Sequence, residues 1–206
     1  MSQNTRFVGL DVHAATIAVA VADQGTEAVE ALGTIAHTPE AVTRLMRKLG
    51  PAATLRVCYE AGPCGYGLYW QLTALGIACM VVAPTLIPVR VGDRVKTDRR
   101  DAEKLARCHR QGVLTAVWVP SPAQEALRDL VRARTAAKQD QLRARHRLGK
   151  FLLRHGRRPA PELRAWGTKH LAWLQTQHFT QPAQDAAFRD YLHEVEHALD
   201  RVRDLE

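Results

Sequence analysis

Four acidic residues of this 206-residue chain stand where carboxylates would be able to act together: Asp11, Glu60, Asp98 and Asp101. Asp11 and Glu60 each follow a short apolar run that is typical of a buried strand. Asp98 and Asp101 are three residues apart at the point where helical periodicity begins, so they share one face of a first helical turn. Two strand ends and one helix start would therefore supply these carboxylates.

Such a set of hard oxygen ligands suits Mg²⁺ or Mn²⁺ better than zinc. Two ions roughly 3.5–4 Å apart would stabilise the attacking and leaving oxygens of a phosphodiester displacement. Each acid also has a purely structural interpretation. Asp11 would cap a turn, Glu60 would be a solvated acid opening a loop, and Asp98 with Asp101 would be a helix N-cap and a first-turn acid.

The elements that must position these acids form a simple order. The pattern predicts three strands, a helix, a strand, a helix and a strand, at residues 7–10, 16–22, 28–35, 38–49, 55–59, 66–75 and 77–82. This order indicates an α/β domain with a mixed sheet, and ribonuclease H-like folds have it. In such a sheet the first and fourth strands are neighbours, so Asp11 and Glu60 would converge. A helix laid across the sheet would bring Asp98 and Asp101 to the same place.

The chain carries a formal charge of +8, which favours an anionic partner such as nucleic acid. Its excess of basic residues lies in a predicted long helical stretch after residue 121. Residues 121–158 contain eleven Lys and Arg but only three Asp and Glu. A solvated helix face is normally mixed in sign, so this one favours contact with a phosphate backbone. The candidate nucleic-acid contacts are Lys96, Arg99, Arg100, Arg128, Arg132, Arg143, Arg147, Lys150 and Arg154.

The last segment of the chain repeats apolar residues at alternating steps of four and three: Phe188, Leu192, Val195, Leu199 and Val202. This spacing predicts a coiled-coil seam and hence a homodimer or a higher oligomer. The alternative is one helix packed on the chain's own core. We expect two domains, an α/β domain over residues 1–120 and a basic helical, coiled-coil region over 121–206.

The four cysteines form no CxxC pair, which argues against a structural zinc site and suits a reducing compartment. The sequence has no apolar run of 18 residues and no N-terminal apolar segment typical of a signal peptide. We therefore expect a cytoplasmic protein without a membrane partner.

Three short motifs carry a resemblance to a known family. They are Gly9-Leu10-Asp11-Val12-His13, then Glu60-Ala61-Gly62, then the string Lys-Thr-Asp-x-x-Asp-Ala over residues 96–102. In this order and spacing they resemble the N-terminal half of the DEDD transposases of the insertion-sequence one-hundred-ten family, which includes the pilin-gene-inverting recombinases. The string over residues 96–102 is the most specific of the three.

The resemblance implies a RuvC-like, ribonuclease H-fold domain in which Asp11, Glu60, Asp98 and Asp101 are the catalytic, metal-binding tetrad. It implies Mg²⁺ or Mn²⁺ as cofactor, DNA as substrate, and strand cleavage and transfer as the reaction. A coiled-coil region used in dimerisation would follow, and a structured guide RNA would be a further partner.

The family's second catalytic domain, which bears a serine nucleophile, should follow the coiled coil. The two serines here, Ser2 and Ser121, lie in no setting suited to a nucleophile. We therefore expect this chain to be the N-terminal portion of a recombinase, incomplete by itself.

Two other functions remain open from the residues. One is a non-catalytic module for nucleic-acid binding and dimerisation, for which alanine at Asp11 or Glu60 would change nothing. The other is an actin-like ATPase or sugar kinase, which also opens with Gly-Leu-Asp and a hairpin. That fold needs further glycine-rich phosphate loops and a longer chain.

Overall fold

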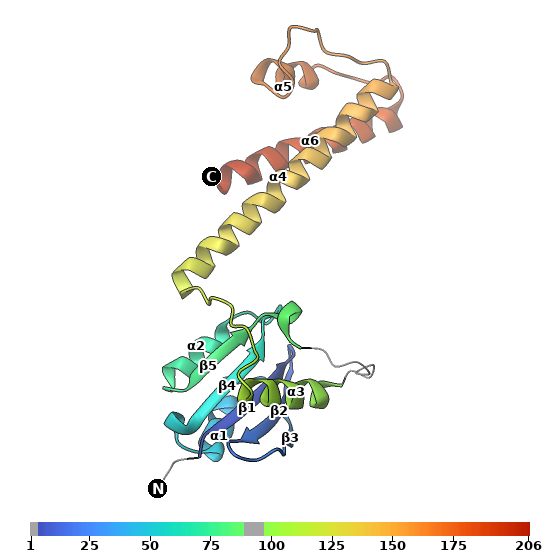
Figure 1. Ribbon diagram of the computed structural model, residues 1–206. Coiled ribbons are helices and arrows are strands. Elements are labelled where there is room, and N and C mark those ends of the chain that lie inside the picture. The colour runs from blue at the N-terminus through green and yellow to red at the C-terminus, as the bar shows by residue number, and fades with distance from the viewer. Residues whose placement is uncertain (1–3, 89–96) are drawn as a thin grey trace. The chain divides into compact units, whose positions relative to one another are not determined.

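The structure is a computed structural model that describes residues 4–88 and 97–206 (Figure 1). The chain forms two compact units, residues 1–119 and 120–206. The first unit contains β1 (Arg6–Val12), β2 (Thr16–Asp23), β3 (Glu30–Ala36), α1 (Pro39–Leu49), β4 (Leu55–Glu60), α2 (Gly67–Ala74), β5 (Ala78–Val82) and α3 (Asp98–Arg110). The second contains α4 (Pro122–Arg154), α5 (Thr168–Gln175) and α6 (Pro182–Asp204).

The five strands form one mixed sheet in the order β3-β2-β1-β4-β5. The first three strands are an antiparallel meander, whereas β1, β4 and β5 run parallel to one another. Parallel neighbours need crossover connections, and α1 and α2 provide them. The prediction of a mixed α/β sheet with the first and fourth strands adjacent is confirmed, and this strand order is consistent with a ribonuclease H-like fold.

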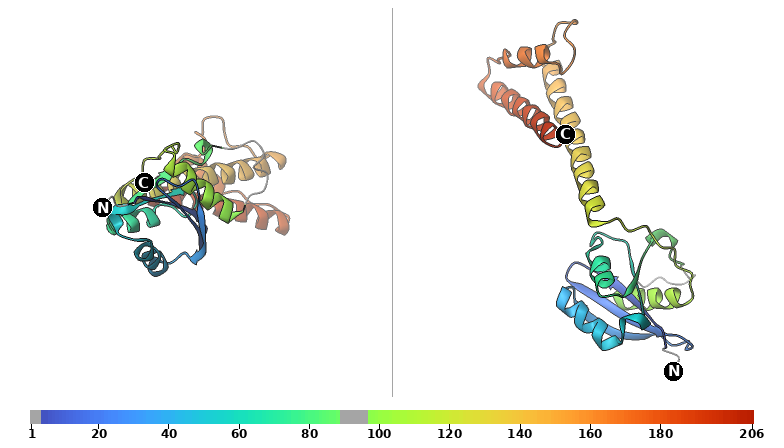
Figure 2. Two further views of the ribbon diagram at one scale, coloured as in Figure 1. Left: turned by 60° about the horizontal axis from the view of Figure 1, so that its bottom comes forward. Right: turned by 90° about the vertical axis from the view of Figure 1, so that its left-hand side faces the viewer.

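One face of the sheet carries the large apolar side chains. Val8, Leu10 and Tyr59 are buried in a core that also contains residues of α1 and α2. Thr38 caps α1, because its hydroxyl oxygen accepts a hydrogen bond from Ala41 N and Pro39 opens the helix. Figure 2 shows α1 and α3 on opposite sides of the sheet.

The other face is built from very small residues and carries α3. Ala18, Ala20 and Ala22 of β2 pack with Ala102 and Ala106 of α3. Gly9 of β1 lies so close to α3 that a Cβ atom there would be 2.3 Å from the Ala102 carbonyl oxygen. Because these residues have very small side chains or none, α3 lies almost directly on the backbone of β1.

The direction of α3 is set at its C-terminal end. The Arg110 guanidinium donates hydrogen bonds to the backbone oxygens of Asp23, the last residue of β2, and of Glu27 and Ala28, which follow it. His109 places its ring 5.5 Å from the ring of Phe7, near the start of β1. The helix therefore runs antiparallel to β1, and its N-terminus lies at the carboxyl end of that strand.

Burial and the Arg56 guanidinium lower the pKa of His109 to about 4. Since unfolded histidine protonates near pH 6.5, the stabilisation from a neutral His109 is complete above that pH and is lost as the pH falls towards 4. Between pH 7.5 and pH 5 we expect the free energy of unfolding to fall by up to about 2 kcal/mol more in the wild type than in His109→Leu, because leucine does not titrate. Urea unfolding of both proteins at the two pH values measures this. Equal losses in both proteins would show that His109 does not carry the effect.

Segment 113–119 forms an extended crossing segment with no regular strand of its own. Val117 N donates to Val81 O and Ala83 N donates to Thr115 O, so the segment runs beside β5 with one isolated bridge. The predicted helix after residue 121 is also present. Ser121 caps it, and Gln124 completes a reciprocal capping box.

In the second unit α4 and α6 pack antiparallel around a core that includes Leu148, Phe151 and Leu174. Arg147 pairs with Glu194 and Asp140 pairs with Arg201, which fixes the opposite directions of the two helices. Phe188, Leu192 and Val195, the first three of the five predicted seam residues, are buried in this core. These seam residues therefore pack on a helix of their own chain, and a coiled coil between chains stays a prediction. Across residues 4–88 and 97–206 no helix is both long and apolar enough to span a bilayer.

Candidate metal centre

Asp11 occupies the second-last position of β1, and its side chain is only 18% exposed. Gly9 faces α3, so alternation along the strand turns Asp11 towards the same side. Burial raises the pKa of the Asp11 carboxyl, and the neighbouring Asp101 and Asp98 carboxylates raise it too, whereas His13 lowers it. This is a carboxylate in a place where a negative charge is costly unless a cation compensates it.

Asp98 and Asp101 both lie in the first turn of α3. The N-cap is Thr97, whose hydroxyl oxygen accepts a hydrogen bond from Arg100 N, so the alternative of Asp98 as the capping residue is wrong. Acids in a first turn are stabilised by the helix dipole and by unpaired backbone N–H groups. Because α3 begins at the carboxyl end of β1, these acids lie beside Asp11, and both of them act on its charge.

His13 completes the cluster, although it was not among the site residues predicted from the sequence. Its Nε2 atom lies 3.2 Å from Asp11 Oδ2 and 3.6 Å from Asp98 Oδ1. One ligand atom from each of Asp11, His13 and Asp98 lies within 4.8 Å of the other two. A signal was present in the sequence, since His13 follows Asp11 by two residues and a strand turns such residues to one face.

Glu60 ends β4 with an exposed side chain. The last paired residues of β1 and β4 are Leu10 and Tyr59, so Asp11 and Glu60 are the next position of the same parallel register. Cys58 contacts the Leu105 carbonyl of α3, and alternation turns Glu60 towards that helix as well. Glu60 therefore lies on the strand next to that of Asp11 and on the face that carries α3, but it is not a member of the three-residue cluster.

The predicted cations around α3 have different settings. Lys96 lies outside the described residues. Arg99 forms an ion pair with Glu103 at 2.8 Å, within the helix. Arg100 has an exposed side chain and lies between Asp98 and Asp101 in the sequence.

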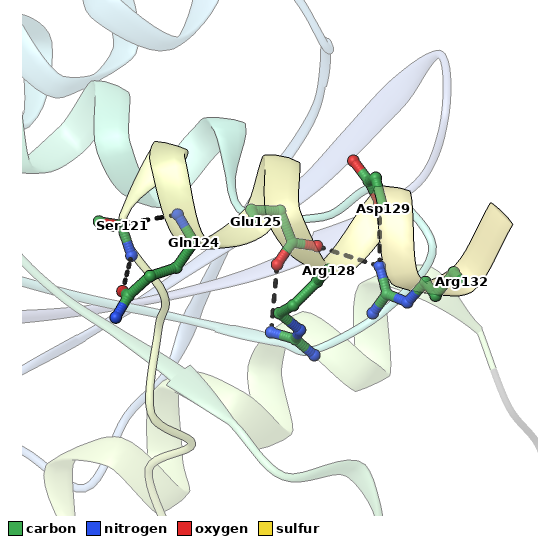
Figure 3. A network of polar contacts seen from close by, with 6 residues as sticks. All are labelled: Ser121, Gln124, Glu125, Arg128, Asp129 and Arg132. Carbon is green, nitrogen blue, oxygen red and sulfur yellow. Dashed lines mark hydrogen bonds and ion pairs between the residues drawn. The ribbon is translucent and has the colours of Figure 1, made fainter. Parts of the chain in front are cut away.

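Most of the predicted cations on α4 are engaged by acids of their own unit. Arg128 and Arg132 share Glu125, and Arg132 also contacts Asp129 (Figure 3). Two further pairs are Arg143 with Asp140 and Arg147 with Glu194. Lys150 and Arg154 are exposed and have no acidic partner among the residues that the structure describes.

Comparison with known proteins gives consistent matches. A family model described as transposase, of the DEDD type and named for IS110, matches residues 8–156. A Sinorhizobium fredii protein named as a transposase, y4qE, is 46% identical over 191 residues, which are 92% of this chain and 49% of that protein. The Leptospira borgpetersenii transposase for insertion sequence element IS1533 is 36% identical over 193 residues, 92% of this chain and 55% of the relative.

A mixed sheet in this strand order, with acids gathered at its carboxyl edge, is consistent with the ribonuclease H-like class of nucleic-acid enzymes. The chain belongs to the DEDD transposase family of the IS110 type, the insertion-sequence one-hundred-ten family. The resemblance drawn from the three motifs is confirmed. The chain spans about half the length of the two relatives just described.

Proposed function

We propose that this chain is the RuvC-like portion of a DNA transposase, and that Asp11, Glu60, Asp98 and Asp101 hold its divalent metal. The observation that carries the proposal is the approach of Asp98 to Asp11 and His13, which brings the start of α3 to the end of β1. The residues fit a cation, because three potential ligand atoms lie within 4.8 Å and the burial of Asp11 disfavours its negative charge.

The bound metal, Mg²⁺ or Mn²⁺, would polarise a phosphoryl oxygen and lower the pKa of a metal-bound water. The chain's own residues have distinct tasks in this proposal. The strand β1 holds Asp11 in place, and the close packing of α3 holds Asp98 and Asp101. Glu60 would supply a further carboxylate from the neighbouring strand, β4. DNA phosphodiester bonds are the proposed substrate.

The proposal is tested by calorimetric titration of Mg²⁺ and Mn²⁺ into this chain and into Asp11→Ala, Glu60→Ala and Asp101→Ala. Loss of binding in all three would show that these acids form one site. Glu30→Ala is the matched control, since Glu30 is an exposed acid at the start of edge strand β3. No binding, or binding indifferent to the three changes, would leave a nucleic-acid-binding module without metal chemistry.

We also propose that the nucleic-acid surface of the second unit lies at the C-terminal end of α4, where the DNA and a structured guide RNA are the candidate partners. The first turns of α4 carry cations already paired with acids (Figure 3), and a paired cation releases fewer counterions on binding a phosphate. Lys150 and Arg154 are exposed without such pairing. Arg157 and Arg158 come shortly after the end of α4, and Arg157 donates a hydrogen bond to the His178 backbone oxygen.

We expect the double variant Lys150→Gln/Arg154→Gln to weaken binding of duplex DNA or hairpin RNA by about tenfold and to lower the salt slope by one to two units. Arg128→Gln/Arg132→Gln, which removes as much charge from paired positions, should cost less than about threefold. Fluorescence anisotropy over a range of salt concentrations measures both, with the DNA and RNA probes compared directly. A larger loss in the second variant would place the surface at the start of α4 instead.

For the proposed homodimer the seam of α6 is already used, since Phe188, Leu192 and Val195 pack inside the unit. Exposed apolar side chains occur instead on α4, among them Leu127 and Val131, which are 61% and 54% exposed. They stand one helical turn apart and so lie on one face. We place the dimer contact of the second unit on this face of α4.

A further inference from the structure

We propose that His13 is a ligand of the metal ion, through Nε2, together with Asp11 and Asp98. This inference rests on the proposed metal site and extends it, because it makes the site a mixed nitrogen and oxygen site. Such a site favours Mn²⁺ over Mg²⁺ more strongly than one built from carboxylates alone.

The distances in the cluster agree with a shared ion. In an octahedral site with metal–ligand bonds of roughly 2.1 Å, adjacent ligand atoms lie about 3 Å apart and opposite ones about 4.2 Å apart. His13 Nε2 is 3.2 Å from Asp11 Oδ2 and 3.6 Å from Asp98 Oδ1, which is close to the spacing of adjacent ligands. Rotations of exposed side chains would be enough to admit the ion, since the side chains of His13 and Asp98 are 52% and 63% exposed.

The backbone of His13 is held firmly at the turn between β1 and β2. Its N–H donates to Thr16 O at 2.9 Å. Its carbonyl oxygen lies 2.8 Å from His37 Nδ1, so the His37 ring donates to it from the end of the neighbouring strand. A ligand on a fixed backbone loses little entropy when it binds, which favours a metal-binding role.

The competing role for His13 is that of a cation that only compensates the two carboxylates. A protonated imidazole would form ion pairs with Asp11 and Asp98 through the same Nε2 atom. The two roles exclude each other, because a protonated Nε2 has no lone pair for a metal. They also predict opposite signs. Loss of a ligand weakens metal binding, whereas loss of a competing cation strengthens it.

The first measurement compares Mn²⁺ and Mg²⁺ binding to the wild type and to His13→Ala by calorimetry. We expect the Mn²⁺ affinity to fall by about tenfold or more and the Mg²⁺ affinity to change by less than about threefold. His193→Ala, which removes an exposed histidine from α6, is the control and should change neither. Unchanged or tighter Mn²⁺ binding in His13→Ala overturns the inference. Circular dichroism of each variant confirms that it folds.

The second measurement reads nitrogen ligation directly. Electron spin echo spectra of the Mn²⁺-loaded chain should show modulation from ¹⁴N, which disappears in His13→Ala and persists in His193→Ala. A wild type that binds no metal overturns the proposed function and this inference together. Metal binding that depends on Asp11 but shows no ¹⁴N modulation leaves the proposed function intact and overturns the role of His13 alone.

Discussion

Gly9→Ala is expected to destabilise the first unit by about 3 kcal/mol or more and to lower its Tm by roughly 10 °C. The added methyl group would lie 2.3 Å from Ala102 O and 2.4 Å from Ala106 N. Both are backbone atoms of α3, so no side-chain rotation relieves the overlap and the helix must move away from the sheet. Thermal and urea unfolding, followed by circular dichroism, measure the loss.

Gly67→Ala is the control for this prediction. Gly67 is the first residue of α2, and a Cβ atom there would meet nothing within 4 Å. Alanine should therefore be neutral or slightly stabilising, by at most about 1 kcal/mol. If both variants unfold like the wild type, the contact between β1 and α3 is looser than the structure shows. Metal titration of Gly9→Ala adds a functional readout, since a displaced α3 would carry Asp98 and Asp101 away from Asp11.

Asp11→Asn is expected to have effects of opposite sign with and without metal. Burial, Asp101 and Asp98 hold the pKa of the Asp11 carboxyl above its usual value, so its ionised form at neutral pH costs stability in the metal-free protein. The neutral amide removes that cost and should raise the Tm. Saturating metal should make the Tm of the wild type the higher of the two. A ligand at roughly 100 times its Kd stabilises the protein that binds it by about 2.7 kcal/mol, and a variant that cannot bind the metal gains no such stability.

The measurement is a pair of melting curves for each protein, in chelator and in excess Mg²⁺ or Mn²⁺. Asp23→Asn, at the end of β2, is a useful comparison because Asp23 forms an ion pair with Arg6, whereas Asp11 lies among other acids. Its substitution should lower the Tm slightly and leave the response to metal unchanged. A metal-free Tm of Asp11→Asn below that of the wild type would mean that Asp11 stabilises the fold by itself, as a turn residue would.

The strands and the helix starts were predictable because each depends on local signals. The apolar run before Asp11, the Thr38-Pro39 cap and the Ser121-Pro122 cap act within a few residues, and the structure has β1, α1 and α4 at these places. The adjacency of β1 and β4 followed from the order of elements.

A helix across the sheet was expected, but residue types alone did not predict how closely α3 approaches β1. This approach depends on Gly9, Ala18 and Ala102 meeting across the sheet, and small residues far apart in sequence give no signal that they touch. His13 was missed as a site residue for a related reason. In the sequence it is only one residue of the motif over residues 9–13, and its role emerges from its contact with Asp98, which lies far along the chain.

The pairing of α4 cations was missed because counting charges ignores geometry. Eleven basic residues against three acids suggested a continuous positive face. The acids are placed so that Glu125 engages both Arg128 and Arg132, and α6 brings Glu194 to Arg147. The distribution of free charge along a helix depends on these partners, some of which come from another element.

The glycine and alanine residues of β1 and β2 that pack against α3 change how the family's sequence motifs should be understood. In Gly9-Leu10-Asp11 the acid follows a glycine by two residues, and in Asp101-Ala102 it directly precedes an alanine. Both of these small residues matter because they leave room for close packing between β1 and α3. Substitution at Gly9 and at Ala102 should therefore be coupled, since extra volume on one side has to be removed from the other. Transplanting only the carboxylates into another α/β scaffold would not reproduce the centre, because the spacing between strand and helix would be wrong. The transferable unit is the acids together with the small residues beside them.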